Sequence, residues 1–208
     1  MRVWITLVAV YLAMFLCSCE DTGNPLVPCL HPLYADTDRE FDPALVGSWT
    51  DEDADVTFTF VKQGDAAYKL TVTEPEQEKP VAADFEVHLV RIGSQYFLDF
   101  YPGAPNVGDD FYRLHLLPVH TIARITVEPE HLQLSLLDSA WLKKQMDNKS
   151  VQLDSNKVDG DVILAATTEE LQGFVDRFAT DDDAFPNPLK LHRAKPASEE
   201  GEQNADPR

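Results

Sequence analysis

The fold of this chain is decided by the stretch DVTFTFVKQGDAAYKLTVT, residues 55–73. Every second residue is apolar on both sides of a turn at Gly64, first Val56, Phe58 and Phe60, then Tyr68, Leu70 and Val72. Residues two apart along a strand point to the same face. The stretch therefore predicts two antiparallel strands, each with one apolar face, joined by a tight turn.

The same alternation extends on both sides of this hairpin. Further strands are predicted at residues 45–50, 83–92, 95–101, 112–117, 120–128, 131–137, 162–165 and 189–192. A long loop is predicted at residues 102–110, which contain two glycines and two prolines. Strands joined mostly by short connections form an antiparallel meander, and a meander with one apolar face curls round its core into a barrel or half-barrel.

Two short helices are predicted in the last third of the chain. The pair Asp138-Ser139 caps a helix at 140–146. Thr167 and Glu170 form the capping box of a second helix, whose apolar residues recur at i, i+3, i+4 and i+7 from Leu171. The expected fold class is therefore β-rich α+β, a curled meander followed by two short helices packed on the sheet.

The tripeptide Gly47-Ser48-Trp49 at the start of the meander resembles the Gly-x-Trp signature of lipocalins and related calycin barrels. In that family the tryptophan closes one end of an up-and-down barrel that holds an apolar ligand, and a basic residue near the last strand packs across it. The resemblance implies a lipocalin-like barrel in which Arg193 or Lys190 is the basic residue. The alternative is that Trp49 is an ordinary core aromatic at the start of a strand.

Aromatic residues of the meander are expected to line any ligand cavity in such a barrel. The predicted lining consists of Trp49, Phe58, Phe60, Tyr68 and Phe97. No catalytic, cofactor-binding or metal-binding residue is predicted, because the chain has no P-loop, dinucleotide fingerprint or Gly-x-Ser-x-Gly motif. Its histidines also lack the i, i+4 spacing of a helical zinc site, so no cofactor or metal is expected.

The first residues of the chain are typical of a targeting segment. Arg2 precedes an uncharged apolar run from Val3 to Cys17, which is shorter than the roughly 20 residues of a membrane-spanning helix. The run ends in Leu16-Cys17-Ser18-Cys19, which resembles the lipobox of bacterial prolipoproteins, although position 17 is more often alanine, serine or threonine in that family. The resemblance implies cleavage after Ser18 and acylation of Cys19, which would anchor the protein to a membrane of the bacterial cell envelope.

Two other interpretations of this segment remain open. An ordinary secretory signal would leave Cys19 able to form a disulfide with Cys29, and an uncleaved segment would be a marginal membrane helix. In the lipoprotein interpretation, Glu20 takes the place of the aspartate that resembles an inner-membrane retention signal. This favours an outer membrane where the cell has one, either on its periplasmic face or at the cell surface.

Composition divides the chain into four parts. We expect a signal peptide at 1–18, a proline-bearing lipidated tether at 19–42, a single β-rich domain at 43–193 and a disordered acidic tail at 194–208. Cys29 falls in the tether, where it is expected to be an unpaired linker thiol.

The net charge of the chain is −19 at pH 7, with 36 acidic and 17 basic residues. Such a surface repels phosphate, and the sequence offers no basic cluster that could displace counterions, so no nucleic-acid partner is expected. The function most consistent with the sequence is a non-catalytic binding or interaction module, whose partner is a small apolar ligand or an envelope protein. The alternative is an envelope hydrolase with a cryptic carboxylate site that uses Asp109 and Asp110.

Overall fold

The computed structural model describes residues 25–53, 55–74, 81–104 and 115–194. Its elements in chain order are β1 (Arg39–Glu40), the 3-10 helix η1 (Pro43–Leu45), β2 (Gly47–Thr50), β3 (Thr57–Gln63), β4 (Ala67–Glu74), β5 (Val81–Ile92), β6 (Gln95–Pro102), β7 (Thr121–Val127), β8 (His131–Leu136), α3 (Ser139–Asp147), β9 (Ser155–Val158), β10 (Asp161–Leu164), α4 (Thr168–Phe178) and β11 (Leu189–Arg193).

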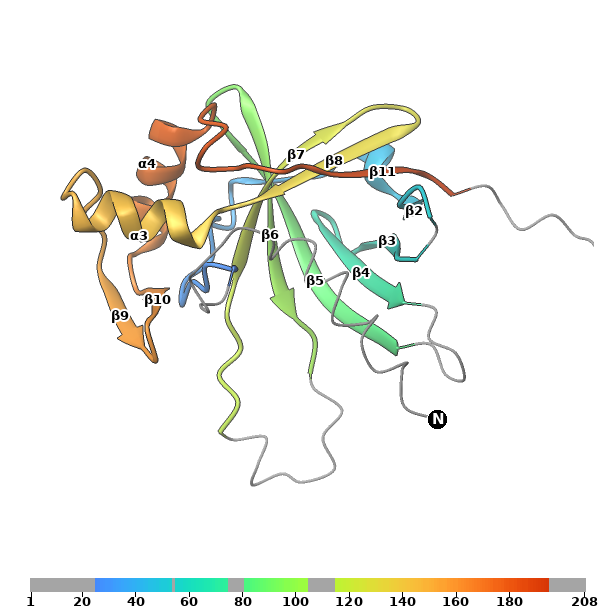
Figure 1. Ribbon diagram of the computed structural model, residues 1–208. Helices are drawn as coiled ribbons and strands as arrows, with labels where there is room; N and C mark the ends of the chain where they lie inside the picture. Colours follow the sequence, from blue (N-terminus) through green and yellow to red (C-terminus); the bar gives the residue numbers. More distant parts are fainter. Residues whose placement is uncertain (1–24, 54, 75–80, 105–114, 195–208) are drawn as a thin grey trace, which may run out of the picture.

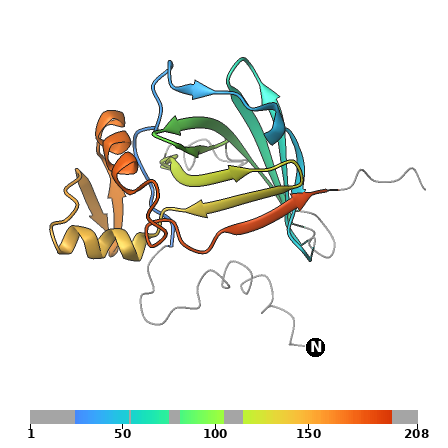
Figure 2. The ribbon, with the colours of Figure 1, turned by 90° about the horizontal axis from the view of Figure 1, so that it is seen from above.

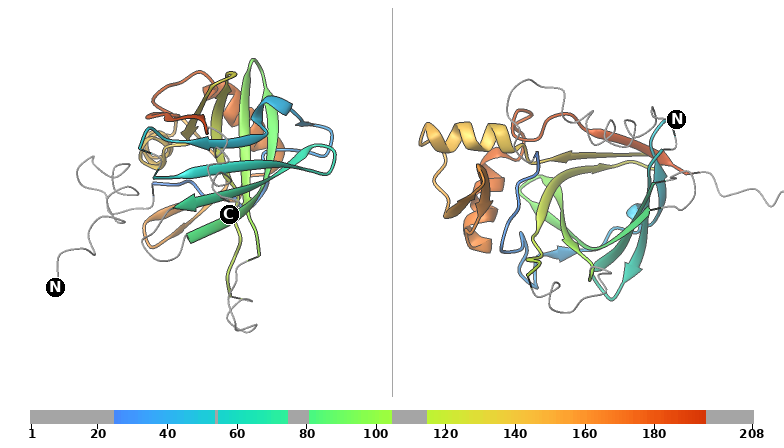
Figure 3. Two further views of the ribbon diagram at one scale, coloured as in Figure 1. Left: turned by 90° about the vertical axis from the view of Figure 1, so that its right-hand side faces the viewer. Right: turned by 60° about the horizontal axis from the view of Figure 1, so that its bottom comes forward.

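Eight antiparallel strands form a closed barrel. Strands β2 to β7 each pair with the next strand in the sequence, and β11 pairs with both β8 and β2 and so closes the ring. The right-hand view of Figure 3 shows this ring, with the helices outside it. The predicted curled meander followed by two short helices is thus confirmed, and of the two forms left open, barrel or half-barrel, the structure has the closed barrel.

The barrel interior is filled by one apolar cluster, here called the inner cluster. The strand register explains its composition, because residues directly opposite each other on neighbouring strands point to the same face. Phe58 lies opposite Val72, and Phe60 lies opposite Leu70. The alternating residues Phe58, Phe60, Tyr68, Leu70 and Val72 therefore face inward, as their spacing predicts, whereas Val56 precedes β3 and is not part of the inner cluster.

A second apolar cluster, here called the outer cluster, lies between the barrel wall and the helices. The chain between β8 and β11 contains α3, the β9–β10 hairpin and α4, and these elements lie together beside the barrel (Figures 1 and 2). Leu171, Phe174 and Val175 of α4 are buried in this cluster together with Val90 and Ile92 of β5. The predicted stripe of the second helix thus packs on the outer face of the sheet.

Both helix caps form as the sequence predicts. The side chain of Asp138 accepts a hydrogen bond from the Trp141 N–H at 2.6 Å. Thr167 and Glu170 make the reciprocal capping box, in which the Glu170 carboxylate accepts from the Thr167 N–H at 2.8 Å. These bonds satisfy N–H groups that have no partner within the helix, and they set where α3 and α4 begin.

The domain begins earlier in the sequence than predicted. Residues 25–42, here called the N-terminal strap, run along the outside of the barrel, and Val27, Cys29 and Leu33 are buried in the outer cluster. The predicted tether boundary at residue 42 is therefore too late. The proline spacing that indicated an extended linker reflects an extended segment that packs on the barrel wall.

Two other predictions differ from the structure. Of the strand predicted at 112–117, residues 115–117 are not in a strand and the others lie outside the described residues. The strand predicted at 162–165 is β10, but it pairs with β9 in a separate two-stranded sheet. The signal peptide, Cys19 and residues 195–208 also lie outside the described residues. Within the described part of the chain, no helix is long and apolar enough to cross a membrane.

Candidate functional site

The two ends of the barrel are built differently. The sealed end carries η1 and the tight β3–β4, β5–β6 and β7–β8 turns, while the open end carries the longer β2–β3, β4–β5 and β6–β7 connections. The chain leaves for the helical region from the open end of β8 and returns to the open end of β11. Apolar side chains at the sealed end are therefore covered by η1 and tight turns, whereas those at the open end lie beside longer connections.

Trp49 and Arg193 close the sealed end. Trp49 is fully buried, and its indole N–H donates to the Leu45 carbonyl of η1 at 2.9 Å. The guanidinium carbon of Arg193 lies 4.2 Å from the centre of the Trp49 ring. The same guanidinium donates to the carbonyls of Ala44, Val46 and Pro129, so it ties η1 and the β7–β8 turn together across the tryptophan.

Gly47 is required by this arrangement. Its φ is +130°, and a Cβ atom added to it would lie 2.8 Å from Nη1 of Arg193. A side chain at position 47 would therefore be strained and would displace the arginine from the tryptophan face. Arg193 thus takes the place that the family resemblance implied for a basic residue near the last strand.

Tyr68 completes the sealed end from β4. It is fully buried, and its hydroxyl accepts from the Asp42 N–H at 2.6 Å and donates to the Asp42 carbonyl at 3.0 Å. Burial raises the pKa of Tyr68 to about 12, so the hydroxyl stays protonated. Phe41 stacks on the tyrosine ring with a centroid separation of 5.1 Å. The end of the strap is thereby fastened over the sealed end.

The five residues predicted to line a cavity divide between several environments. Trp49, Phe60 and Tyr68 are fully buried in the inner cluster, and the rings of Phe60 and Tyr68 pack edge to face at 6.3 Å. Phe58 belongs to the same cluster but is only partly buried, because it lies at the start of β3 at the open end.

The prediction for Phe97 is wrong. Phe97 lies opposite Val90 on β5 and is buried in the outer cluster, where its ring packs against Phe185 at 5.5 Å. The inward positions on β6 are Leu98 and Phe100. A run of apolar residues on this strand hid the alternation, because both of its faces are covered.

The open end carries apolar side chains that are only partly buried. They belong to five different strands and lie in the half of each strand nearer its open end: Phe58, Val72, Phe85, Leu136 and Leu189. Phe58 is the deepest of them, since it lies directly opposite Trp49. We call these five residues the mouth. Phe85 packs edge to face on Phe100 at 6.5 Å, which joins the mouth to the interior of the inner cluster. Three partly buried residues of the inner cluster, Phe41, Val46 and Val127, lie at the sealed end, so the mouth is the larger of the two places where the apolar interior meets solvent among the described residues.

Only Phe58 among the mouth residues was predicted as a site residue. The others obey the same alternation as the core, and a strand pattern does not say which end of a barrel is covered. Their position at strand ends that precede or follow long connections is the one signal in the sequence that could have indicated them.

A second arrangement of functional groups lies on the outer wall, beneath the strap. The carboxylate of Asp99 is fully buried, with Oδ1 2.6 Å from Nδ1 of His120, and its Oδ2 accepts from the Leu33 N–H at 2.7 Å. His88, directly opposite Asp99 on β5, is also buried, and the ring of Tyr34 lies 4.2 Å from it. These groups hold the strap on the wall.

Cys29 lies beside the Asp99–His120 pair. The three side chains together have the composition of a nucleophile, a base and an orienting carboxylate. The backbone of Cys29 exchanges two hydrogen bonds with His120, each 2.8 Å long, but its thiol is directed at the Val27 carbonyl, 3.8 Å away. Burial and the nearby Asp99 raise the pKa of the thiol from 9.0 to about 12. A protonated thiol that solvent does not reach is a poor nucleophile, so the geometry fits a structural clamp. The prediction that Cys29 lies in a free linker is wrong.

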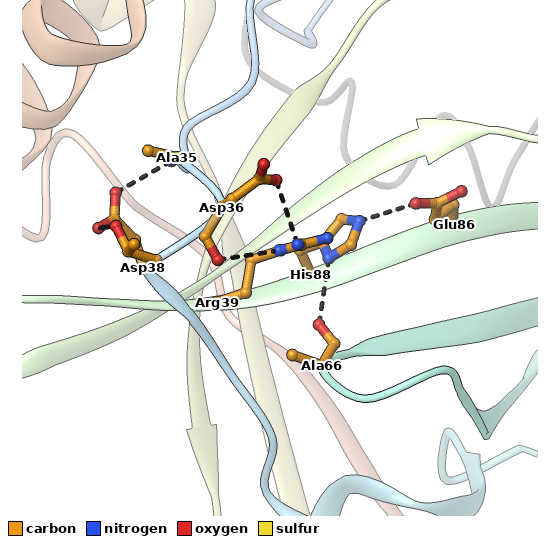
Figure 4. A network of polar contacts seen from close by, with 8 residues as sticks. Ala35, Asp36, Asp38, Arg39, Ala66, Glu86 and His88 are labelled. Atoms are coloured by element: carbon orange, nitrogen blue, oxygen red, sulfur yellow. Dashed lines mark hydrogen bonds and ion pairs between the residues drawn. The ribbon is translucent and has the colours of Figure 1, made fainter.

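Polar contacts farther along the strap hold its own turn together, tie it to α4, and pair two residues of β5 beneath it (Figure 4). Asp38 accepts from the Ala35 N–H at 2.9 Å and from the Gln172 amide of α4 at 2.8 Å. The hydrogen bonds from Gln172 and Ala35 lower the pKa of the Asp38 carboxyl. Arg39 pairs with Asp36 at 3.1 Å, and Glu86 pairs with His88 at 2.8 Å.

Hollows on the outside of the domain include one beside the strap and one beside the chain that follows α4. The larger, with a volume of about 670 Å³, lies between the strap, the β5–β6 turn and α4, and its lining includes Asp38, Glu40, Glu169 and Asp176. The smaller, of about 470 Å³, lies between β7, β8 and the chain that follows α4. The larger hollow is polar and acidic, and neither has the apolar lining predicted for a ligand cavity.

The described residues do not support a metal site, and they do not test the hydrolase alternative. In the ranges that the structure describes, no group of three or more His, Cys, Asp or Glu side chains is placed to hold a metal ion. Asp109 and Asp110, on which the hydrolase alternative rests, lie outside the described residues. Comparison of the chain with protein-family models, curated proteins and solved structures finds no match.

Proposed function

We propose that this protein is a lipid-anchored, non-catalytic binding module of the bacterial cell envelope that holds a small apolar ligand at the open end of its barrel. The observation that carries the proposal is the mouth, where five apolar side chains from five strands are partly exposed and continuous with the inner cluster. Removing apolar surface from water stabilises a complex by about 25 cal/mol per Å². An apolar ligand seated on the mouth would remove part of this surface from water.

The sealed end supports a single route of access. Trp49, Arg193 and Tyr68 close that end with a buried ring, three carbonyl contacts and a buried hydroxyl. A ligand would therefore enter and leave through the open end, where Phe58 and Phe85 are partly exposed.

The proposed anchor rests on Leu16-Cys17-Ser18-Cys19. Two or more acyl chains hold a protein stably on a bilayer, so no apolar helix would be required. We place the domain on the side of the membrane away from the cytoplasm, at the outer membrane where the cell has one.

The anchor is tested by the intact mass of the membrane-extracted protein beside a Cys19→Ala variant. A mature chain that begins at Cys19 and carries added acyl mass, lost in the variant, is the expected result. An unmodified chain that retains Cys19 as a thiol would overturn the anchor.

Ligand binding is tested with cis-parinaric acid, a fluorescent fatty acid, added to the unacylated Cys19→Ala chain so that no detergent is needed. We expect saturable binding, weakened at least tenfold by Phe85→Glu and by the smaller change Val72→Glu. The matched control is Val61→Glu, because Val61 is 53% exposed on the outer face of β3. Circular dichroism confirms that each variant is folded. Equal affinities for the mouth variants and the control, or no saturable binding, would refute the proposal.

A further inference from the structure

Because the strap is packed on the barrel, few residues are free to connect the domain to the proposed anchor at Cys19. It is fixed by the buried Val27, Cys29 and Leu33, by the two backbone hydrogen bonds between Cys29 and His120, and by the bond from Leu33 to Asp99. Residues that are buried and hydrogen-bonded cannot detach from the barrel and extend as a flexible tether. The chain able to act as a tether therefore ends close to Pro25.

The remaining tether is short. Pro25 is the sixth residue after Cys19. A fully extended chain spans at most about 3.3–3.6 Å per residue, so Pro25 lies within about 20 Å of the acylated cysteine. The domain must then lie close to the bilayer, and one of its faces must be turned toward the lipid.

The position of the strap indicates which face this is. Cys29 pairs with His120, which immediately precedes Thr121, and Thr121 lies opposite Phe100 at the open end of β6. The strap therefore joins the barrel wall at the level of the open end. In the same connection, shortly before His120, Leu116 and Leu117 are 38% and 69% exposed.

Leu117 is the most exposed large apolar side chain in the described ranges. Two adjacent exposed leucines next to the anchored strap are suited to insertion into the interfacial region of a bilayer, since apolar side chains gain free energy on leaving water.

Acidic residues occur around the open end, and the β6–β7 connection has two of its own in the sequence, Asp109 and Asp110. The β2–β3 connection holds the exposed acidic residues Glu52, Asp53 and Asp55. It lies on the opposite side of the ring from the β6–β7 connection, because four strands separate them in either direction. An anionic bilayer repels acidic groups, so a tilt that brings Leu117 to the lipid also moves this acidic connection away from it.

We propose that the open end of the barrel docks on the bilayer that holds Cys19, with Leu116 and Leu117 in the lipid interface. The inference rests on the proposed anchor, and it places the mouth where an acyl chain could pass from the bilayer to the barrel without crossing water.

The test measures which end of the barrel is shielded by lipid. Full-length acylated protein is placed on the outside of vesicles of phosphatidylcholine and phosphatidylglycerol, with the fluorophore NBD attached to Leu117→Cys or, as a control, to Val61→Cys near the sealed end. Cys29 is not labelled, because its thiol is buried. The membrane-impermeant reductant dithionite then destroys NBD that faces water.

We expect reduction at position 117 to be at least tenfold slower than at position 61, and the two rates to become equal when the vesicles are dissolved in detergent. Equal rates on intact vesicles would overturn the docking. The parinaric acid experiment is independent: binding without shielding at 117 would refute docking alone, whereas shielding without binding would refute the ligand site and support docking.

Discussion

Inward-facing aromatic residues occur at both ends of the barrel, but they are fully buried at the sealed end and partly exposed at the open end. At the sealed end, Trp49 and Tyr68 are fully buried and each has a backbone hydrogen-bond partner. At the open end, Phe58 and Phe85 continue the same inward rows but are left partly in water. The alternation of a strand therefore decides which residues face inward, while the elements that cover each end decide which of them contribute most to stability.

The largest difference between the ends is expected for aromatic deletion. Trp49→Ala should lower the free energy of unfolding by about 3–5 kcal/mol, because it leaves a cavity in a fully buried site. Phe85→Ala should cost about 1 kcal/mol, because part of that ring is already exposed. Urea unfolding followed by circular dichroism measures both. Equal losses would show that the open end is as well packed as the sealed end.

A smaller loss is expected where the strap meets the wall near the open end. Asp99→Ala leaves the buried Leu33 N–H without its acceptor and removes the partner of His120, which should cost about 3 kcal/mol. The reaction of Cys29 with a thiol reagent should also speed up, because the strap that covers it loosens. The matched control is Asp84→Ala, whose exposed carboxylate contacts Thr71 and Lys69 and whose loss should leave the free energy of unfolding nearly unchanged. An unchanged labelling rate in Asp99→Ala would contradict a clamping role.

Replacement of the arginine at the sealed end should have a moderate effect. Arg193→Lys retains the charge but cannot donate to the carbonyls of Ala44, Val46 and Pro129 together, so we expect a loss of about 1–2 kcal/mol. Arg91→Lys, at an exposed position beside the β5–β6 turn, should change the unfolding free energy by less than about 0.5 kcal/mol. Similar values for the two variants would show that the guanidinium geometry is not what holds this end closed.

An effect confined to alkaline conditions, and therefore absent at neutral pH, is expected from Cys29. Because burial raises the pKa of Cys29 to about 12, the unfolded thiol loses its proton at a lower pH than the native one, and stability should fall as the pH rises from about 9 toward 12. Cys29→Ala removes this contribution and should lose less stability between pH 8 and pH 10.5 in urea titrations. The native thiol should also resist labelling at pH 8 until urea unfolds the protein. Rapid labelling without urea would place Cys29 at the surface.

Local pattern was sufficient for the curled meander and for both helices, but it left open whether the meander closes into a barrel. The hairpin at residues 55–73 has strong period-two alternation, and the capping box at Thr167 combines with a helical stripe, so each segment specifies its own conformation. A basic residue on Trp49, either Arg193 or Lys190, was expected only from the family resemblance, since no local signal links residues so far apart in the sequence, and the structure places Arg193 there.

The strap and Phe97 required knowledge of tertiary packing. The strap has proline spacing typical of a linker, and its burial depends on an outer wall that exists only once β5, β6 and α4 have assembled. Phe97 lies on a strand whose two faces are both covered, so its neighbours Leu98 and Phe100 gave no contrast that would reveal which face is the interior. The open end could not be identified for a related reason, since what covers a strand end is determined by distant segments.

The position of β11 constrains when the barrel can close during synthesis. This last strand completes the ring, and Arg193 contacts Val46 across 147 residues of sequence. Pairing between such distant segments carries an entropic cost of loop closure, and contacts of this kind form slowly. Until β11 leaves the ribosome or a translocation channel, β2 and β8 remain unpaired edges beside an exposed apolar interior. The nascent chain therefore needs protection from aggregation for nearly the whole of its elongation, and a truncation before residue 189 would leave it permanently open.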